Sequence, residues 1–508
     1  MKNLAQKNIL ILGLGSSGLA LARWCIRCGA QQVMVADTRP APPQLKALQT
    51  TLPSAVFVHA DMSEALLALS DFDMVLKSPG LSPGSVAAVT AAAQARGIAC
   101  GNELSLFAQA LADLKEDRAY APQVIAITGT NGKTTVTSLT GQLVQRAGKS
   151  VAVAGNIGPT LLDTLSGKLD EKSADGGLPA LSALPEVWVL ELSSFQLDGI
   201  KNFEPTVATT LNISQDHLDW HGTLSAYMAA KENIYGSTGL MLLNRDDPLV
   251  MTALPPLVKG KQARSFLTFG GDEPKRPGDY GIEMVNGMAW LVRAMEADET
   301  IKRRKTEEVV LHIQRLMPLD ALRIHGRHNA TNALAALGLA VAAGCPLAPM
   351  LHGLREYRGE PHRVESVAVL GGVEYFDDSK GTNVGATVAA LVGLGADRKL
   401  VLILGGEGKG QDFSPLAEPV SRHARAVVLI GRDAPLIRQV LQHSPVALLD
   451  AASMEEAVSM AAAQARQGDA VLMSPACASF DMFANYEHRA QVFCDAVQAM
   501  AQEQGAVL

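Results

Sequence analysis

A short glycine loop between a strand and a helix, at residues 129–135, constrains the fold more than any other feature of this sequence. The apolar run at residues 124–128 predicts a buried strand, and residues 136–147 predict a helix. Between them the chain reads Gly-Thr-Asn-Gly-Lys-Thr-Thr. Glycines let backbone N–H groups turn toward an anion, and the helix N-terminus adds a favourable dipole. The unit therefore predicts a phosphate site similar to those of P-loop ATPases.

Two side chains at the end of this loop have the chemistry that a nucleotide site needs. Lys133 can reach the outer phosphates, and the Thr134 hydroxyl can bind Mg²⁺. The loop is shorter than the usual P-loop, because Ile127 stands where the first glycine is expected and Gly129 begins the loop. A tight strand-to-helix turn is the alternative, but it does not require the Gly-Lys-Thr ending. We expect the loop to bind ATP.

Carboxylate and imidazole groups follow the next predicted strands. Glu191 ends the apolar run at residues 187–190, at the edge where parallel sheets bind ligands, and Mg²⁺ prefers such oxygen ligands. A helix-capping carboxylate is the alternative. The polar cluster at residues 212–221 includes His217 and His221, which have metal-ligand spacing on a helix. A zinc site lacks supporting cysteines here, so we expect only that this loop faces the same crevice.

The pattern along the chain indicates an α/β protein. Short apolar runs alternate with longer helical patterns almost from end to end, as in parallel sheets. Because a chain of 508 residues is too long to fold around one hydrophobic core, we expect several domains. These are a Rossmann-like domain at 1–105, a P-loop ATPase-like domain with a mostly parallel sheet at 106–360, and a Rossmann-like domain at 361–508. Residues 166–185 and 272–320 show no clean period and predict surface loops or decorations.

The composition and net charge of the chain limit the kinds of molecule that it is expected to bind. Hydrophobic residues make up 48% and charged residues 19% of the chain, as in a soluble globular protein. The net charge of -7 gives no general reason to bind nucleic acid or an anionic membrane. The apolar run at residues 8–22 resembles a signal peptide, but its glycines and Arg23 fit a strand, a turn and a helix better. We expect a cytoplasmic protein.

Six cysteines are scattered over the chain and do not form a disulfide framework. Cys25 and Cys28 form a C-x-x-C pair inside an apolar helical pattern. We interpret the pair as one helical turn, and a redox or zinc site is the alternative. The expected compartment is reducing.

Two further glycine-rich segments are candidate binding sites. Gly13, Gly15 and Gly18 follow a strand, and Asp37 ends the next strand near the distance expected for a ribose contact. Either NAD(P) or another nucleotide or nucleotide sugar fits that pattern. The segment at residues 405–410 resembles a phosphate loop without the final Ser or Thr. It is either a mobile loop that offers a lysine to a substrate carboxylate or a flexible turn.

Taken together, these motifs resemble the Mur ligases, which build the peptide stem of bacterial peptidoglycan. The string at residues 128–135 marks the broader family, which includes folylpolyglutamate synthase. More specific are Gly-Asn-Ile-Gly at residues 155–158, Glu-Leu-Ser-Ser-Phe-Gln at 191–196 and His-Asn-Ala-Thr-Asn-Ala at 328–333. The segments at residues 378–383 and 474–479 suggest a member that adds D-glutamate.

The resemblance implies roles for individual residues. ATP would contact Gly129, Thr130, Asn131, Gly132, Lys133, Thr134, Thr135, Asn329, Asn332, Arg363 and Asp378. Two Mg²⁺ ions would be held by Thr134, Glu191, His217 and Lys231, and Lys133, Glu191, His217 and Lys231 would be the catalytic set. Lys231 matches a family lysine that CO₂ carbamylates, which turns a cation into an anion. From the sequence alone it is a lysine on an amphipathic helix, where a solvated side chain is the default.

The substrates implied by the resemblance are UDP-N-acetylmuramoyl-L-alanine and D-glutamate, and a nucleotide sugar is therefore favoured over NAD(P). The nucleotide sugar would contact Ser16, Ser17, Thr38, Arg39, Ser78, Gly80 and Asn156. D-Glutamate would contact Lys380, Thr382, Lys409, Ser479, Phe480 and Tyr486. Two departures from the family pattern are Tyr486, where phenylalanine is common, and Ser16, where a larger aliphatic residue is usual.

The implied activity is ATP-dependent amide formation through an acyl phosphate, in peptidoglycan precursor synthesis and hence in cell-wall biogenesis, cell shape and cell division. The implied protein is a cytoplasmic monomer with ATP and Mg²⁺ as its cofactors. Three rivals are a sister ligase for L-alanine or a diamino acid, a dehydrogenase, and a P-loop ATPase of the motor type that needs neither ligase substrate.

Overall fold

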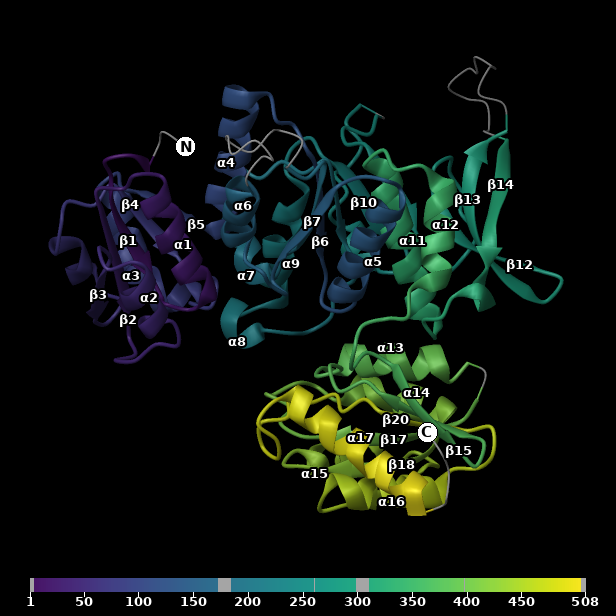
Figure 1. Ribbon diagram of the computed structural model, residues 1–508. Coiled ribbons are helices and arrows are strands. Elements are labelled where there is room, and N and C mark those ends of the chain that lie inside the picture. Colours follow the sequence, from purple (N-terminus) through teal and green to yellow (C-terminus); the bar gives the residue numbers. More distant parts are fainter. Residues whose placement is uncertain (1–3, 172–183, 260, 298–309, 397, 504–508) are drawn as a thin grey trace.

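The computed structural model describes residues 4–171, 184–259, 261–297, 310–396 and 398–503. Three β-sheets follow one another along the chain, and helices pack on each of them (Figure 1). The predicted three-domain α/β architecture is confirmed. None of the helices in the described ranges combines the length and the apolar character needed to span a bilayer.

The N-terminal sheet has five parallel strands in the order β3-β2-β1-β4-β5, the Rossmann-like topology that the sequence predicts. The strands are β1 Asn8–Leu12, β2 Gln32–Asp37, β3 Val56–His59, β4 Met74–Lys77 and β5 Ala99–Asn102, and the helices are α1 Ser16–Arg27, α2 Leu45–Thr51 and α3 Pro83–Ala95. The sequence pattern does not predict β3 and β5. Both are only four residues long, and most of their side chains are exposed or half-buried.

Glycines allow α1 to pass close to the end of β1. A Cβ atom at Gly18 would lie 2.0 Å from the carbonyl oxygen of Gly13, which no side chain could tolerate without movement. Gly13 itself has a φ of 90°, in the left-handed region. The spacing of these glycines is therefore a requirement of the strand-to-helix turn, whichever nucleotide the turn binds.

The central sheet has nine strands in the order β14-β13-β12-β11-β10-β9-β6-β8-β7. Its mostly parallel part contains β6 Gln123–Thr128, β7 Val151–Gly155, β8 Val187–Glu191, β9 Val207–Thr210, β10 Leu240–Asn244 and β11 Phe266–Phe269. The helices of this domain are α4 Glu103–Arg118, α5 Lys133–Arg146, α6 Leu161–Asp170, α7 Ser194–Leu197, α8 Leu218–His221, α9 Leu224–Glu232, α10 Pro248–Met251, α11 Arg327–Ala342 and α12 Leu347–Glu356. Strand β6 leads into the glycine loop and α5, as predicted.

The prediction of loops at residues 272–320 is wrong. This stretch forms β12 Tyr280–Val285, β13 Met288–Glu296 and β14 Leu311–Pro318, an antiparallel ribbon that extends the sheet. Asn286 and Gly287 join the first two strands with φ angles of 50° and 81°, as a two-residue hairpin turn requires. The prediction at residues 166–185 is wrong at its start, because α6 continues to Asp170. Residues 172–183 and 298–309 of these stretches lie outside the described residues.

The third sheet has six strands in the order β15-β16-β20-β17-β18-β19. The strands are β15 Glu365–Leu370, β16 Val373–Asp377, β17 Leu400–Gly405, β18 Ala424–Ile430, β19 Ala447–Asp450 and β20 Ala470–Met473, with helices α13 Val384–Leu394, α14 Ala417–His423, α15 Ala434–Leu441, α16 Met454–Gln464 and α17 Tyr486–Glu503. Five of them, β16, β20, β17, β18 and β19, are parallel to their neighbours within this group, in agreement with the predicted Rossmann-like domain. The sixth, β15, is antiparallel and lies at the edge.

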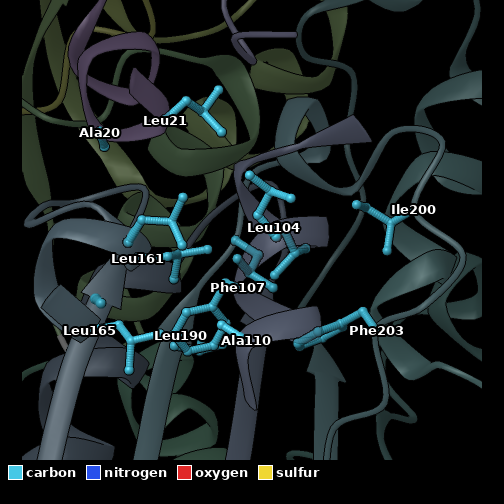
Figure 2. Packing of buried hydrophobic residues seen from close by; sticks show 14 of the residues in the cluster. Ala20, Leu21, Leu104, Phe107, Ala110, Leu161, Leu165, Leu190, Ile200 and Phe203 are labelled. Carbon is cyan, nitrogen blue, oxygen red and sulfur yellow. The ribbon is translucent and has the colours of Figure 1, made fainter. Parts of the chain in front are cut away.

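The first two domains share one hydrophobic cluster. Figure 2 shows Leu21 of α1, Leu104 and Phe107 of α4, and Leu161 and Leu165 of α6, all members of this cluster. The buried apolar residues of the third domain form clusters of their own. Since apolar burial is the main source of stability, the N-terminal and central domains are held as one body.

The close approach of Gly18 to Gly13 gives a prediction. We expect Gly18→Ala to destabilise the N-terminal domain by about 2 kcal/mol or more, because the added methyl group would displace α1 from β1. Gly167→Ala in α6 is the matched control, since a Cβ there meets nothing within 4 Å. It should be neutral or stabilise the helix by up to about 1 kcal/mol. Thermal unfolding of both variants checks this, and equal melting temperatures would contradict it.

Candidate functional site

The phosphate loop is closed by its own lysine. Gly129 and Gly132 have φ angles of 154° and 80°, so the loop needs glycine at both positions. The Lys133 Nζ donates hydrogen bonds of 2.8 Å each to the carbonyl oxygens of Gly129 and Thr130. Burial lowers the pKa of Lys133. The ammonium group thus lies on the concave side of the loop, where it would form an ion pair with a bound phosphate.

A second lysine reaches the same loop from α9. Lys231 is 1% exposed, and its Nζ donates to the Thr128 Oγ1 at 3.2 Å and to the Gly129 carbonyl at 2.9 Å. Burial, together with the nearby charge of Lys133, brings the pKa of Lys231 well below its ordinary value. The default interpretation of a solvated lysine is therefore wrong. A lowered pKa favours the uncharged amine, which is the nucleophilic form of lysine.

Glu191 lies at the end of β8, beside the loop, and is 1% exposed. Its Oε1 accepts a hydrogen bond of 2.9 Å from the Asn156 Nδ2. Its Oε2 is buried and has no hydrogen-bond partner among the described residues. A buried carboxylate oxygen without a donor is costly unless a cation completes its environment. The site therefore fits Mg²⁺, which prefers oxygen ligands.

The two histidines of the 212–221 cluster do not form a zinc pair. His217 has a φ of 53° and directly precedes α8, and its carbonyl oxygen accepts a hydrogen bond of 3.0 Å from the His221 backbone N–H, but the two rings have different partners. The His221 Nε2 lies 2.9 Å from the Ser194 Oγ, whereas the His217 Nε2 lies 3.6 Å from the Asp216 Oδ2. Their rings pack on Phe195 at centroid distances of 4.7 and 5.8 Å. Both rings therefore belong to one aromatic cluster around Phe195.

A cavity of about 570 Å³ lies between the central and third domains. Its lining contains the four residues predicted around the nucleotide outside the loop, Asn329, Asn332, Arg363 and Asp378. Asn131, Gly132 and Thr135 of the loop also line it. Lys380, predicted on the D-glutamate side, lines the same cavity. The structure thus brings together residues from two domains in a space large enough for a nucleotide.

Polar groups of the third domain contact the phosphate loop directly. The Arg363 Nη2 donates a hydrogen bond of 2.7 Å to the Thr134 Oγ1. Behind it, the Asp378 Oδ2 accepts one of 2.6 Å from the Ser474 Oγ, and burial raises the pKa of Asp378 to about 7. The third domain therefore places the Arg363 guanidinium group and the Asp378 carboxyl group, whose pKa is raised, beside the loop.

The predicted D-glutamate residues come from neighbouring segments of the third domain. The Lys380 Nζ lies 3.6 Å from the ring centre of Tyr486, and the Lys409 Nζ lies 5.7 Å from that of Phe480. Phe480 is 64% exposed, whereas Ser479 is buried. Thr382 precedes α13 and is partly buried. Of this set, Lys380 lines the cavity between the two domains, and the other five residues lie outside its lining.

Asp433 is a residue that the sequence analysis missed. Its Oδ2 accepts a hydrogen bond of 2.7 Å from the backbone N–H of Gly408, next to Lys409. The same loop pairs with the Ser479 segment through an antiparallel bridge between Glu407 and Ala478. Asp433 is the third residue after β18, so its position close to the end of a buried strand was an available signal. It holds the Lys409 loop in place.

At the glycine turn of the N-terminal domain, the Asp37 carboxylate already accepts hydrogen bonds from groups of the protein. Asp37 accepts hydrogen bonds of 2.8 Å from the Leu14 backbone N–H and from Arg39, and the Arg39 guanidinium lowers the pKa of Asp37 to about 2. A ribose hydroxyl would have to compete with these donors, which disfavours NAD(P) here. Ser78 lies near Gly15, and a Cβ at Gly80 would meet open space.

The remaining predicted residues of this domain lie around the same turn. Ser16 is exposed at the start of α1, and the Ser17 side chain hydrogen-bonds to the buried Glu103. Thr38 and Arg39 are exposed after β2. None of these four residues lines the cavity between the central and third domains. Cys25 and Cys28 are free thiols whose pKa values burial raises, so they behave as a helical turn and not as a redox pair.

Comparisons with known proteins cover almost the whole chain. Residues 7–100 match the model of a Mur ligase MurD-like N-terminal domain, residues 127–340 that of a Mur ligase middle domain, and residues 362–477 that of a Mur ligase glutamate ligase domain. A UDP-N-acetylmuramoylalanine–D-glutamate ligase of Polaromonas sp. is 61% identical, with 100% of both chains covered. One of Albidiferax ferrireducens is 64% identical, with 100% of this chain and 99% of that protein covered.

Solved structures of similar shape agree in fold. The chain resembles a MurF from Acinetobacter baumannii with a TM-score of 0.55 and 16% identity, covering 98% of this chain and 92% of that one. It also resembles a MurF ligase from Thermotoga maritima in complex with ADP, with a TM-score of 0.53, 16% identity, and 99% and 100% covered. At this level of identity the likeness shows the fold alone.

The unpartnered oxygen of Glu191 gives a second prediction. Glu191→Gln keeps the acceptor for Asn156 but replaces the Oε2 with a neutral N–H group, so we expect Mg²⁺ to bind about 10-fold more weakly or worse. The increase in melting temperature that Mg²⁺ with ATP produces should largely disappear. Glu283→Gln, which disturbs an ion pair with Arg315 on the distant ribbon, is the control and should keep the full increase. An unchanged response in the Glu191 variant would rule out this carboxylate as a ligand.

Proposed function

The chain belongs to the Mur ligase family, and from this we propose that it uses ATP to join D-glutamate to UDP-N-acetylmuramoyl-L-alanine. It is an ATP-dependent ligase that forms an amide bond. One observation carries the proposal for the site: the phosphate loop of the central domain opens into a cavity that Arg363 and Asp378 of the third domain complete. Two substrates bound to different domains would meet there.

The reaction needs activation, because a carboxylate does not condense with an amine in water. The L-alanine carboxylate attacks the γ-phosphorus of ATP, the bond from that phosphorus to the bridging oxygen breaks, and ADP leaves. The amine of D-glutamate then attacks the acyl carbon, phosphate leaves, and the amine loses a proton. Lys133 neutralises charge on the transferring phosphoryl group, and the converging domains position the reactants.

Mg²⁺ would lie between the phosphates and the end of β8. Thr134, Glu191, His217 and Lys231 are the proposed ligands of two ions, and the unpartnered Oε2 of Glu191 supports this. Bound Mg²⁺ supplies positive charge that stabilises the phosphoryl oxygens.

Lys231 requires modification to serve as a ligand of a cation. The uncharged amine attacks the carbon of CO₂, an N–C bond forms, and a proton leaves, so the product is an anionic carbamate. Burial and the lowered pKa of Lys231 support this proposal, because both favour the uncharged amine. The carbamate oxygens would bind Mg²⁺, as other hard oxygen ligands do.

The two organic substrates would bind at opposite ends of the site. The nucleotide sugar would contact Ser16, Ser17, Thr38, Arg39, Ser78, Gly80 and Asn156, and D-glutamate would contact Lys380, Thr382, Lys409, Ser479, Phe480 and Tyr486. The two lysines of the second set suit a dicarboxylate. The aromatic ring beside each lysine orients its ammonium group.

This activity would place the protein in the synthesis of peptidoglycan precursors, and so in cell-wall biogenesis, cell shape and cell division. A substrate carried on UDP is water-soluble, which supports a cytoplasmic site of action. We propose a monomer, with domain boundaries at residues 105/106 and 360/361. The proposed site is completed by residues of this one chain.

The amino-acid specificity can be tested directly. With the nucleotide sugar and ATP present, we expect ADP release and amide formation with D-glutamate, and neither with L-glutamate, L-alanine or a diamino acid. The physical reason is that both lysines must meet carboxylates while the amine faces the acyl carbon. Chromatography of product and a coupled ADP assay measure the two outcomes. If ADP release is indifferent to D-glutamate and no amide forms, the proposed function is wrong.

The modification of Lys231 can be tested by spectroscopy. Protein equilibrated with ¹³C-bicarbonate should show a carbamate carbon resonance that is absent in Lys231→Arg, and that variant should lose activity by about 100-fold or more. Lys201→Arg, at an exposed lysine, is the control and should keep both. A carbamate signal of equal strength in the Lys231 variant would assign the modification to another group.

A further inference from the structure

A reciprocal pair of amide hydrogen bonds joins the phosphate loop to the third domain. The Asn383 Nδ2 donates to the Asn131 Oδ1 at 3.0 Å, and the Asn131 Nδ2 donates to the Asn383 Oδ1 at 3.3 Å. Asn383 is 6% exposed, so water competes little with these bonds. Each amide offers the other both a donor and an acceptor, which makes the contact specific in orientation.

Both amides are fixed on their own side of the boundary. The Asn131 backbone N–H donates to the Asn212 Oδ1 at 2.8 Å, and the Asn212 Nδ2 returns a bond of 3.1 Å to the Asn131 carbonyl. Across the boundary, the Asn383 Oδ1 accepts a bond of 2.9 Å from the Ala386 backbone N–H and so caps α13. The pair therefore connects two rigid elements and not two free side chains.

The surroundings of the pair require a close approach of the domains. The Asn383 Nδ2 also lies 3.5 Å from the Asp216 Oδ2, in the segment that carries His217. A Cβ atom at Gly385 would lie 2.6 Å from the Ser214 Oγ of the same segment. The first turn of α13 thus packs against both the phosphate loop and the loop after β9.

The pair lies between the two chemical halves of the site. Asn131 precedes Lys133 by two residues in the phosphate loop, and Asn383 directly follows Thr382 on the amino-acid side. A shift of α13 away from Asn131 would move Thr382 away from the phosphates by a similar amount. The pair therefore links the position of the phosphate loop to the position of the residues on the amino-acid side.

We propose that Asn383 is a positioning residue that couples the consumption of ATP to amide formation. The inference rests on the proposed function. When the pair is formed, the third domain covers the loop and presents the amine to the acyl phosphate. When it is broken, water reaches the acyl phosphate and returns it to the carboxylic acid and phosphate, so ATP is consumed without an amide product.

The experiment measures ADP and amide in the same reaction of the full-length protein with both substrates. Asn383→Ser keeps a hydroxyl that can cap α13 but is too short to reach Asn131. Asn383→Asp keeps the cap and the size but puts an oxygen opposite the Asn131 Oδ1 and the Asp216 carboxylate. The wild-type protein should release about one ADP per amide, and both variants about two or more, since the uncovered intermediate is hydrolysed.

Ser453→Ala supplies the matched control. Ser453 caps α16 in the same domain by accepting a bond of 3.2 Å from the Glu456 backbone N–H, and it lies outside the site. Its loss should lower stability as a lost cap does, by about 1 kcal/mol, and leave the ratio of ADP to amide unchanged. Melting temperatures of the three variants separate a loss of stability from a loss of coupling.

The outcomes distinguish this inference from the function on which it rests. If the wild-type protein forms the amide and both Asn383 variants keep its ADP-to-amide ratio, the inference is overturned and the function stands. A parallel fall of ADP and amide at a constant ratio likewise assigns Asn383 a structural role only. If the wild-type protein releases ADP without forming an amide, the proposed function itself fails.

Discussion

The carbonyl oxygen of Gly129 accepts hydrogen bonds from two lysines, and the site is organised around this convergence. Lys133 belongs to the loop itself, whereas Lys231 comes from α9, about 100 residues later in the chain. Burial lowers the pKa of both lysines, and the charge of Lys133 lowers that of Lys231 further, because two ammonium groups on one oxygen repel each other. The phosphate loop is thus a place where positive charge is concentrated before any nucleotide binds.

The three domains contribute to this site through different kinds of contact. The N-terminal and central domains share a hydrophobic cluster across α1, α4 and α6, which fixes their relative position. The third domain touches the phosphate loop through Arg363 and Asn383, both polar. Hydrogen bonds depend on the distance and direction between donor and acceptor, whereas apolar burial depends mainly on area. The contacts of the third domain with the phosphate loop therefore specify its orientation more closely than a shared apolar cluster would.

Much of this arrangement follows from the sequence, and the rest depends on long-range packing. The strand, loop and helix at residues 123–146 were predictable because glycine spacing and apolar periodicity are local signals. The ribbon at residues 280–318 was missed although Asn286-Gly287 marks its turn, because its charged strands hide the alternation. The burial of Lys231 has no local signal at all; it arises from how α9 packs on the sheet, and only the family resemblance pointed to it.

The proposed carbamate on Lys231 would change the balance of charges around the phosphate loop. With both lysines protonated, Lys133, Lys231 and Arg363 face the carboxylates of Glu191 and Asp216, so cations outnumber anions. Conversion of Lys231 to a carbamate removes one cation and adds one anion, so the balance reverses. The proposed modification would thus add negative charge beside the unpartnered oxygen of Glu191 and strengthen the binding of a divalent cation, so the affinity of the site for metal would depend on the supply of CO₂.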